Sequence, residues 1–253
     1  MGAHHRPLQE APRLKLSVVV PAYNEERLLA ATLASIRAAA KEFDEGGGWE
    51  LIVCDNNSTD RTADIARAAG ARVVFEPHNQ ISRARNCGAA AAQGDWLVFV
   101  DADSLPSAGL FRELKAAIES GSCIGGGCSI APVGESFAFR LSIRAWNALS
   151  HLTRWAAGSF VFCERSVFAE LRGFSEELYA SEEVDFSGRL KRLARSRGKR
   201  IAILRQHPLL TSARKLQLYG LGELAGFFVR IVFRPHRTLR NAADCKPWYD
   251  GRR

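Results

Sequence analysis

The sequence predicts an α/β fold in which a mainly parallel central sheet is covered by helices on both faces. Apolar, β-branched runs alternate with Ala-rich runs of helical spacing between residues 15 and 118. The run WLVFV at residues 96–100 is apolar throughout, which is typical of a strand buried on both faces. A chain of 253 residues, 47% of them hydrophobic, can fill the core of one such domain or of two small ones.

The first two repeats each consist of a strand, a polar loop and a helix. Residues 15–21 (KLSVVVP) are an expected strand, and residues 26–43 have the apolar spacing and Ala content of a helix. Residues 49–55 (WELIVCD) repeat the strand. The polar loop after them leads to a second helix, for which Ser58 or Asp60 is the expected N-cap.

The repeat continues to residue 118. Residues 71–77 are the next expected strand, and a helix over residues 81–93 should end at Gly94. Residues 95–104 contain the apolar strand, and the segment SLPSAGLFRELKAAI that follows should be a helix. Four strands that alternate with helices in this way favour parallel pairing.

The second half is predicted to be mixed. Residues 158–193 should form a strand, a short helix, a Gly-Phe turn and a longer helix that opens with acids. Residues 200–204 (RIAIL) are a further strand, and a helix should start near Ser212. The apolar spacing beyond residue 212 predicts an amphipathic helix, either packed on the rest of the chain or lying in the plane of a membrane.

Charge is distributed unevenly along the chain, whose formal net charge is +8. From Gly188 to the C-terminus there are 17 Lys and Arg residues against three acids, whereas the preceding residues carry 18 against 24. Such asymmetry is typical of a surface that meets an anionic partner such as phosphate or a lipid headgroup. The alternative is a set of solvated helix faces. We expect no nucleic-acid partner, because no recognisable binding module accompanies the basic residues.

Composition also bears on location and on the cysteines. We expect no membrane span, because no apolar run approaches the length of about 20 residues that a span needs. The N-terminal stretch MGAHHRPLQEAPRLK lacks the apolar middle of a secretory signal, so we expect a cytoplasmic protein. The six cysteines form no C-x-x-C pair, and we expect buried free thiols rather than disulfides or a zinc site.

Two carboxylates, Asp101 and Asp103, end the buried strand in the stretch VFVDADS. Alternate residues of an extended chain point to the same side, so these two side chains should converge. Like charges that close ionise together only beside a cation, which favours a hard divalent metal ion. Alternatively, the aspartates only begin a turn, with Asp103 and Ser104 starting the following helix.

The loops after the first two strands should face the same site, because ligands of open sheets bind beyond the carboxyl ends of the strands. Tyr23 offers an aromatic face, Asn24 and Glu25 offer polar groups to a ribose or base, and Asp55 can accept a hydrogen bond from a base N–H. These side chains predict a nucleoside site.

Three polar residues in the helix before the strand that ends at Asp101 are further candidates for the nucleotide site. Arg83, Arg85 and Asn86 could reach the same site, where Arg suits neutralisation of a phosphate or orientation of a carboxylate. The alternative is that these polar side chains only face solvent and keep the helix soluble.

Four stretches, VVVPAYNEE, IVCDNNSTDRT, SRARNCGAAAAQGDWLVFVDADS and ASEEVDF, resemble the successive motifs of family 2 glycosyltransferases in order and spacing. The resemblance covers about residues 15–212. It implies a GT-A fold with a Rossmann-like nucleotide-binding half and an acceptor-binding half, and a nucleotide-sugar donor, most commonly with UDP. It further implies that the PAYNE loop and Asp55 hold the base, that Asp101 holds the ribose, and that Asp103 holds Mg²⁺ or Mn²⁺ on the diphosphate.

Residues and resemblance together define the expected donor site and domains. The donor-binding set is Pro21, Ala22, Tyr23, Asn24, Glu25, Asp55, Asn57, Arg83, Arg85, Asn86, Asp101, Ala102 and Asp103. The expected domains are a tail at 1–14, a GT-A catalytic domain at 15–212 with a donor half to about 105, and a basic amphipathic helix and tail at 213–253.

The stretch ASEEVDF is expected to supply the catalytic base. By itself, Ser181 followed by acids indicates only a helix N-terminus, where the dipole stabilises carboxylates. In the family that the chain resembles, an Asp at this position acts as base, and the alignment puts Glu183 there. Glu182 and Asp185 are the other candidates, because the change from Asp to Glu lengthens the side chain.

The resemblance implies a single displacement with inversion, with a carboxylate base on the acceptor hydroxyl and a metal on the leaving diphosphate. Related enzymes also use a late His as a metal ligand, so His207 joins Asp101 and Asp103 as a candidate, with the alternative of a structural role. The expected acceptor is a carbohydrate or a lipid-linked molecule, with possible peripheral contact to an anionic membrane. The alternative function is a non-catalytic nucleotide-sugar-binding or membrane-tethered protein on the same fold.

Overall fold

The computed structural model describes residues 15–46, 48–133, 143–144, 147–148, 150–156, 158–212, 239–241 and 245. The expected tail at 1–14 and nearly all of the expected amphipathic segment at 213–253 lie outside these residues. Among the helices that are described, none combines the length and the apolar character that crossing a membrane requires.

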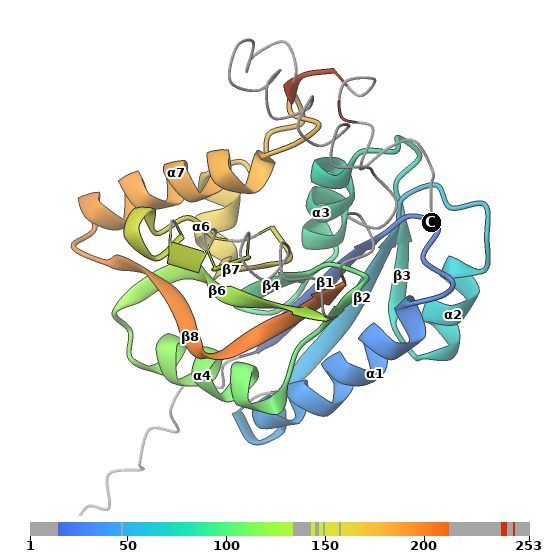
Figure 1. The fold of residues 1–253 in the computed structure, drawn as a ribbon, viewed down its shortest axis with the longest axis horizontal. Helices are drawn as coiled ribbons and strands as arrows, with labels where there is room; N and C mark the ends of the chain where they lie inside the picture. The colour runs from blue at the N-terminus through green and yellow to red at the C-terminus, as the bar shows by residue number, and fades with distance from the viewer. Residues whose placement is uncertain are drawn as a thin grey trace, which may run out of the picture.

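The structure alternates strands and helices through its first half, as predicted (Figure 1). In order, the elements are β1 (Leu16–Ala22), α1 (Leu29–Ala40), η1 (Lys41–Gly46), β2 (Trp49–Asp55), α2 (Thr62–Ala68), β3 (Arg72–Phe75), α3 (Ile81–Ala90), β4 (Trp96–Val100), β5 (Ser104–Leu105), α4 (Ala108–Glu119), β6 (Cys123–Val133), β7 (Phe160–Glu164), α6 (Arg165–Glu170), α7 (Glu182–Ser196) and β8 (Arg200–Ser212).

All eight of these strands form one sheet in the order β3-β2-β1-β4-β7-β6-β8-β5. The predicted parallel pairing is confirmed for β3, β2, β1 and β4. Strand β7 then pairs antiparallel with both β4 and β6, while β8 runs parallel to β6. Because β7 runs opposite to β4, the segment just before β7 lies beside the carboxyl end of β4, where Asp101 follows.

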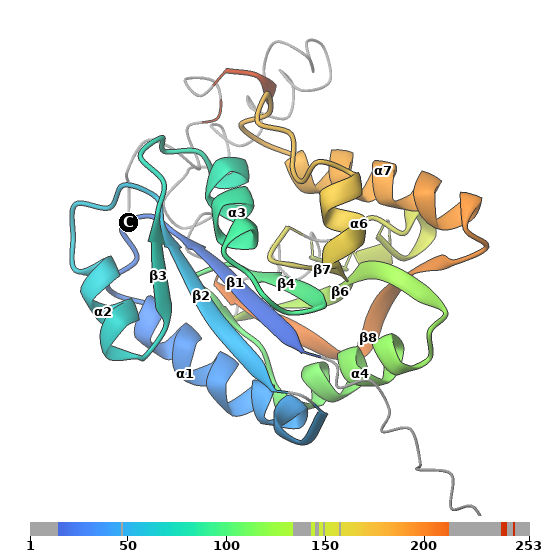
Figure 2. The same ribbon diagram turned by 180° about the vertical axis from the view of Figure 1, so that it is seen from behind.

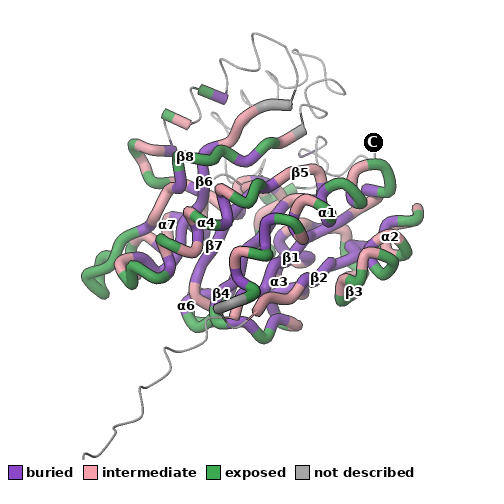
Figure 3. Tube along the Cα trace, turned by 90° about the horizontal axis from the view of Figure 1, so that it is seen from below, coloured by how far each residue is buried: buried purple, intermediate pink, exposed green. Residues whose placement is uncertain are grey.

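Helices cover both faces of the sheet. Figures 1 and 2 show α1, α2 and α4 on one face and α3, α6 and α7 on the other. Strand β1 supplies both layers, since Val18 and Val20 pack with the first group and Val19 packs with the second. Figure 3 shows the central strands largely buried and the exposed residues concentrated on the outer helices and loops.

Several element boundaries differ from the prediction. Helix α1 begins at Leu29 rather than at residue 26, because a turn closes first, with the Leu28 and Leu29 N–H groups bonded to the Glu25 carbonyl. The N-cap of α2 is Arg61, although Asp60 still accepts the Thr62 N–H at 2.9 Å. The boundaries of these helices thus differ from the prediction by a few residues, while the order of the elements is as predicted.

Strand β8 is the largest difference, because it continues through Pro208 to Ser212 where a loop and a helix start were predicted. Proline cannot donate to a strand ladder, and here it lies at a register shift between the pairings of Leu204 and Leu209 with β6. The irregular register lets the strand pass the proline.

All six cysteines are free thiols, as predicted. Burial raises the pKa of the Cys128 and Cys163 thiols, so both behave as small apolar groups in the core.

Strand β8 approaches β6 so closely that Gly126 leaves no room for a side chain. A Cβ placed on Gly126 would lie 1.8 Å from the carbonyl oxygen of Ala202, its partner in the ladder. In contrast, a Cβ on Gly188 in α7 would meet nothing nearer than Arg192 Nη1 at 3.9 Å.

We therefore expect Gly126→Ala to lower the midpoint of thermal unfolding, since backbone atoms must shift to admit the methyl group. Gly188→Ala is the matched control and should raise stability by about 0.5–1 kcal/mol, because alanine favours a helix interior. Thermal unfolding followed by circular dichroism measures both. A Gly126→Ala protein as stable as the parent would contradict the packing argument.

Candidate functional site

The loops after β1 and β2 are joined by side-chain hydrogen bonds. The pairing of Ala22 with Asp55 places the two loops next to each other at the carboxyl edge of the sheet. Asn24 Oδ1 accepts the Thr59 N–H at 2.8 Å, and the Asn24 N–H donates to Ser58 Oγ at 3.0 Å. Asn24 holds a φ of 52°, a conformation that Asn tolerates better than most residues. The two predicted nucleotide loops therefore form one preformed unit.

The predicted donor-site residues on these loops differ in how accessible they are. Asp55 is buried, and its Oδ1 accepts the Ser58 N–H at 3.1 Å. Glu25 is buried too, with its own N–H bonded to Thr62 Oγ1 at 2.7 Å. Tyr23 is half-buried and Asn57 is exposed. The other two members of the set, Pro21 and Ala22, are buried residues of β1.

The two aspartates do not lie on one extended strand, which corrects the argument for their convergence. Residues 101–104 form a turn that is closed by a hydrogen bond from the Ser104 N–H to the Asp101 carbonyl at 3.1 Å. Ala102, inside the turn, is buried, and its carbonyl accepts from Thr32 Oγ1 at 2.8 Å. The turn that had been the alternative is present, but it ends in β5 rather than in a helix.

Arg85 is the centre of the site. Its side chain is 1% exposed, yet it carries a full charge. Nη1 donates to Glu182 Oε1 at 2.6 Å, while Nη2 donates to Asp101 Oδ1 at 2.9 Å and to the Gly158 carbonyl at 2.8 Å. The guanidinium also lies 5.2 Å from the ring centre of Phe174. One side chain on α3 thus connects the turn at residues 101–104, here called the D-x-D turn, to the start of α7.

The three acids in the first turn of α7 have different surroundings. Glu182 is buried and paired with Arg85. Asp185 is paired with Arg189, which also donates to the carbonyls of the loop before α7. Glu183 receives no side-chain hydrogen bond from the described part of the chain. It lies against Gly158, where an added Cβ would come within 3.0 Å of Glu183 Oε1.

The surroundings of Glu183 make it a stronger base than an ordinary carboxylate. Desolvation, followed by the negative charge of Glu182, raises the pKa of Glu183 to about 8, against the opposing effect of Arg85. The same contacts raise the pKa of Arg85 further above its usual range despite its burial, with Asp101 as the strongest favourable partner. A carboxyl group with a raised pKa, beside a fixed cation, is typical of a catalytic acid or base.

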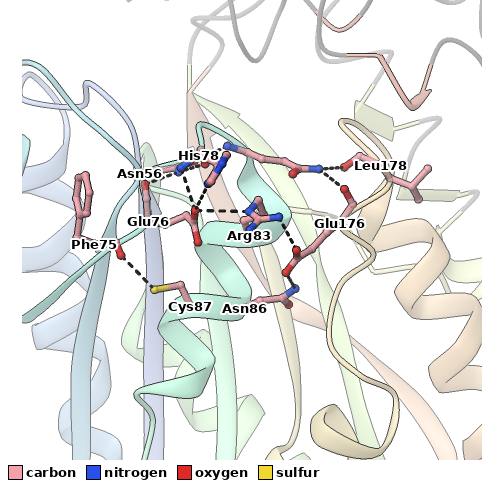
Figure 4. Close-up of polar contacts among 10 residues, drawn as sticks. Asn56, Phe75, Glu76, His78, Arg83, Asn86, Cys87, Glu176 and Leu178 are labelled. Atoms are coloured by element: carbon pink, nitrogen blue, oxygen red, sulfur yellow. Dashed lines mark hydrogen bonds and ion pairs between the residues drawn. The ribbon is translucent and has the colours of Figure 1, made fainter.

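Arg83 and Asn86 contact the loop before α7 rather than the aspartates. Figure 4 shows both on the side of α3 that faces residues 174–178. Arg83 Nη1 donates to Glu176 Oε2 at 2.7 Å. Asn86 bonds the backbone of Phe174 twice, at 2.9 Å each. Of the three candidates on α3, Arg85 alone contacts the D-x-D turn.

Two residues that connect the loops of the site, Asn56 and Gln80, were not expected from the sequence. Asn56, buried beside Asp55, donates to the His78 carbonyl at 2.6 Å and accepts the Gln80 N–H at 2.9 Å. Gln80 in turn donates to the Glu176 and Leu178 carbonyls at 2.7 and 3.0 Å. Together they connect the loop after β2 with the loop before α7. The adjacent asparagines at 56 and 57 were a weak signal for Asn56, and Gln80 had none.

His207 does not join the aspartates, so its assignment as a metal ligand is corrected. It lies on β8 against α4, where an added Cβ on Gly109 would be 2.3 Å from its ring and Glu113 Oε2 is 3.6 Å from Nδ1. The residue of β8 that pairs next to Asp103 is Thr211, opposite Ser104. Four residues of strand separate it from His207, about 13 Å.

The carboxylates of Asp101 and Asp103 suit a hard metal ion. Asp101 keeps one oxygen that Arg85 does not bind, and Asp103 is half-buried in the same turn. Within the described residues, no group of three metal-ligating side chains is present. One or two carboxylates completed by substrate phosphates and water are the usual ligands of Mg²⁺, and Mn²⁺ accepts the same oxygens.

The sequence matches the family described as "Glycosyl transferase family 2" over residues 17–173. Among the relatives is an uncharacterised glycosyltransferase of Mycobacterium tuberculosis, 38% identical over 107 residues. That stretch is 42% of this chain and 45% of the relative. The chain therefore matches under half the length of this protein.

Solved structures resemble the fold over most of the chain. Staphylococcus aureus TarS 1-349, in complex with UDP-GlcNAc, matches with a TM-score of 0.61 and 18% identity over 94% of this chain and 71% of that one. Glucosyl-3-phosphoglycerate synthase of M. tuberculosis, in complex with Mn²⁺, UDP and phosphoglyceric acid, gives a TM-score of 0.58 and 22% identity over 87% and 76%. The fold is the expected GT-A fold.

Replacing Arg85 should strongly destabilise the protein. Arg85→Gln leaves Glu182 buried and Asp101 largely buried without a cation, which should cost about 3–5 kcal/mol of unfolding free energy. Arg83→Gln, two residues away in an ion pair that is partly exposed, is the control and should cost about 1 kcal/mol or less. Urea denaturation measures both. Equal losses of unfolding free energy in the two variants would contradict the conclusion that the buried ion pairs of Arg85 stabilise the fold more than the exposed pair of Arg83.

Glu183→Gln should change how stability depends on pH. Between the ordinary pKa of 4.5 and the folded value of about 8, the folded parent holds a proton that the unfolded chain releases. Stability of the parent therefore falls as pH rises through this window, and the variant escapes that loss. Its melting temperature should rise relative to the parent between about pH 5 and about pH 8.

Glu119→Gln, at an exposed carboxylate at the end of α4, controls for the loss of one negative charge. A Glu183→Gln difference that stays constant across the window would show that burial does not hold the proton there.

Proposed function

The chain belongs to glycosyl transferase family 2, and from this premise we propose that it transfers a sugar from a nucleotide diphosphate sugar to an acceptor hydroxyl. The observation that carries the proposal is the joining of the D-x-D turn to the acids of α7 through Arg85. A displacement at a sugar carbon needs groups for the leaving diphosphate and for the attacking hydroxyl on opposite sides of that carbon, and these two segments supply them.

We favour UDP as the nucleotide. This choice is supported by the similar TarS and glucosyl-3-phosphoglycerate synthase structures, which hold UDP-GlcNAc and UDP. The joined loops of residues 23–26 and 56–62 would bind the base, with Asp55 accepting from a base N–H. Asp101 would bind the ribose, and its orientation is fixed in advance by Arg85.

A divalent ion, Mg²⁺ or Mn²⁺, would be held by Asp103, with the free oxygen of Asp101 as a second ligand. When bound, such an ion neutralises the charge that grows on the departing diphosphate. The chain's own part is to present carboxylate oxygens at the sheet edge and to hold Asp101 in place through its ion pair with a buried guanidinium.

Glu183 is the proposed base. It would take the proton of the acceptor hydroxyl onto a carboxylate oxygen while the hydroxyl oxygen bonds to the anomeric carbon and the carbon–diphosphate bond breaks. Glu182 is occupied by Arg85 and Asp185 by Arg189, so both are less suited to this role. Displacement from the opposite side in one step inverts the configuration of the sugar.

The acceptor half is proposed to extend from about residue 106 to residue 212, after a donor half over residues 15–105. A carbohydrate or a lipid-linked molecule is the proposed acceptor. The basic C-terminal segment, proposed to touch an anionic membrane, lies outside the described residues.

The alternative is a non-catalytic protein that binds a nucleotide sugar, and the Glu at the position of the family's Asp is the feature in its favour. Titration calorimetry with UDP, GDP and dTDP, each with and without Mn²⁺, tests the donor site shared by both functions. We expect one nucleotide to bind, with the metal-dependent part of its affinity lost in Asp103→Asn. Binding of none would contradict the proposal.

Turnover separates the two functions. With UDP-glucose and UDP-GlcNAc as probes, an enzyme releases UDP when metal is present, whereas a sensor leaves the donor intact. Glu183→Gln should keep donor binding and lose about 10²- to 10⁴-fold in rate, and the parent's rate should rise with pH up to about 8. Asp185→Asn is the control. Turnover retained in Glu183→Gln would move the base to Glu182 or Asp185.

A further inference from the structure

A basic surface covers the end of the molecule where α7 joins β8, outside the site described above. A cavity of about 250 Å³ lies there, next to a second of about 150 Å³. Arg154, Arg200 and Ile201 line both, so the two form one continuous hollow. We call this hollow and its cations the α7–β8 basic surface. Its cations are Arg154, Lys191, Arg195, Lys199, Arg200 and Arg205.

These cations are not balanced by acids. Within the described residues, no carboxylate pairs with any of the six side chains, and two of the lysines donate only to backbone carbonyls, those of Thr153 and Gly121. Residues 188–212 contain eight Lys and Arg residues and no Asp or Glu. By contrast, many arginines elsewhere in the described structure are paired, among them Arg67 with Asp64 and Arg112 with Glu42.

An apolar side chain stands beside the cations. Leu152 is 83% exposed and lines the smaller cavity with Lys191 and Arg195. Ile201, Ala202 and Ile203 of β8 are the apolar residues that line the larger cavity. A leucine this exposed, ringed by cations, is suited to entering a lipid layer whose headgroups the cations bind.

The surface lies away from the proposed site of sugar transfer. Figures 1 and 2 show the α7–β8 connection at one edge of the molecule, with β3 and α2 at the other. The first turn of α7 carries the acids near Arg85, and its last turn carries Arg195. The helix dipole accounts for a cation at that end, but not for the arginines of β8 and of the segment before it.

We propose that the α7–β8 basic surface docks on an anionic phospholipid bilayer, with lipid phosphates in the hollow and Leu152 among the acyl chains. Positive charge that is contributed by three chain segments and spread over this surface matches the many phosphates of an anionic membrane, and the exposed leucine distinguishes that occupant from a soluble polyanion. The docking rests on these charges and on Leu152, and it is independent of the proposed sugar transfer.

Sedimentation with vesicles tests the docking, using the full chain without donor. Vesicles of phosphatidylcholine with about one third phosphatidylglycerol should bind the protein, and phosphatidylcholine alone should not. Arg154→Gln with Arg200→Gln should raise the lipid concentration for half-binding about 25-fold, since each cation near an anionic surface contributes about fivefold. Leu152→Ser should weaken binding about tenfold.

The matched control is Lys41→Gln with Arg67→Gln, which removes the same charge from α2 and the end of α1 and should leave binding nearly unchanged. Circular dichroism verifies that each variant is folded. Equal binding of parent and Arg154→Gln/Arg200→Gln would overturn the proposal, because the contact would then lie elsewhere. The proposal would also be overturned if the protein bound heparin through these arginines and did not bind vesicles, because the occupant would then be a soluble polyanion.

Discussion

The buried guanidinium of Arg85 is the interaction on which the rest of the site depends. A charge removed from water must be matched by opposite charge and hydrogen bonds, and here Asp101, Glu182 and the Gly158 carbonyl supply them. Since these partners come from three separate segments, their contacts with one side chain fix the positions of the D-x-D turn, the segment before β7 and the start of α7 together.

The three neighbouring acids of α7 have different surroundings. Glu182 neutralises Arg85 and, by its negative charge, helps to hold the proton on Glu183. Asp185 binds Arg189, which secures the loop before α7 through two carbonyls. Three carboxylates within one helical turn therefore have three environments, and the pKa of Glu183, whose side chain forms no ion pair in the described structure, is raised toward neutrality by desolvation and by Glu182.

Helix α7 has two ends with opposite character. Its first turn is acidic and faces the sheet edge, while residues from its last turn into β8 are basic and face outward. Both ends agree with the helix dipole, so the charges add to the stability of the helix as well as to the two surfaces. Because the basic surface lies on the same helix as the acids of the proposed transfer site, docking through it would hold that site in a defined orientation relative to the membrane.

The sequence by itself determined the order of strands and helices, the parallel half of the sheet and the polar loops at its carboxyl edge, since periodicity and loop chemistry are local. It also placed Asp55, Asp101 and Glu183 at element ends. The tertiary structure alone decided which of Arg83, Arg85 and Asn86 reaches the aspartates, and that His207 packs on α4. Those outcomes depend on pairings such as that of Arg85 with Glu182, 97 residues apart, and a hydrophobic pattern shows which face is buried but not what it meets.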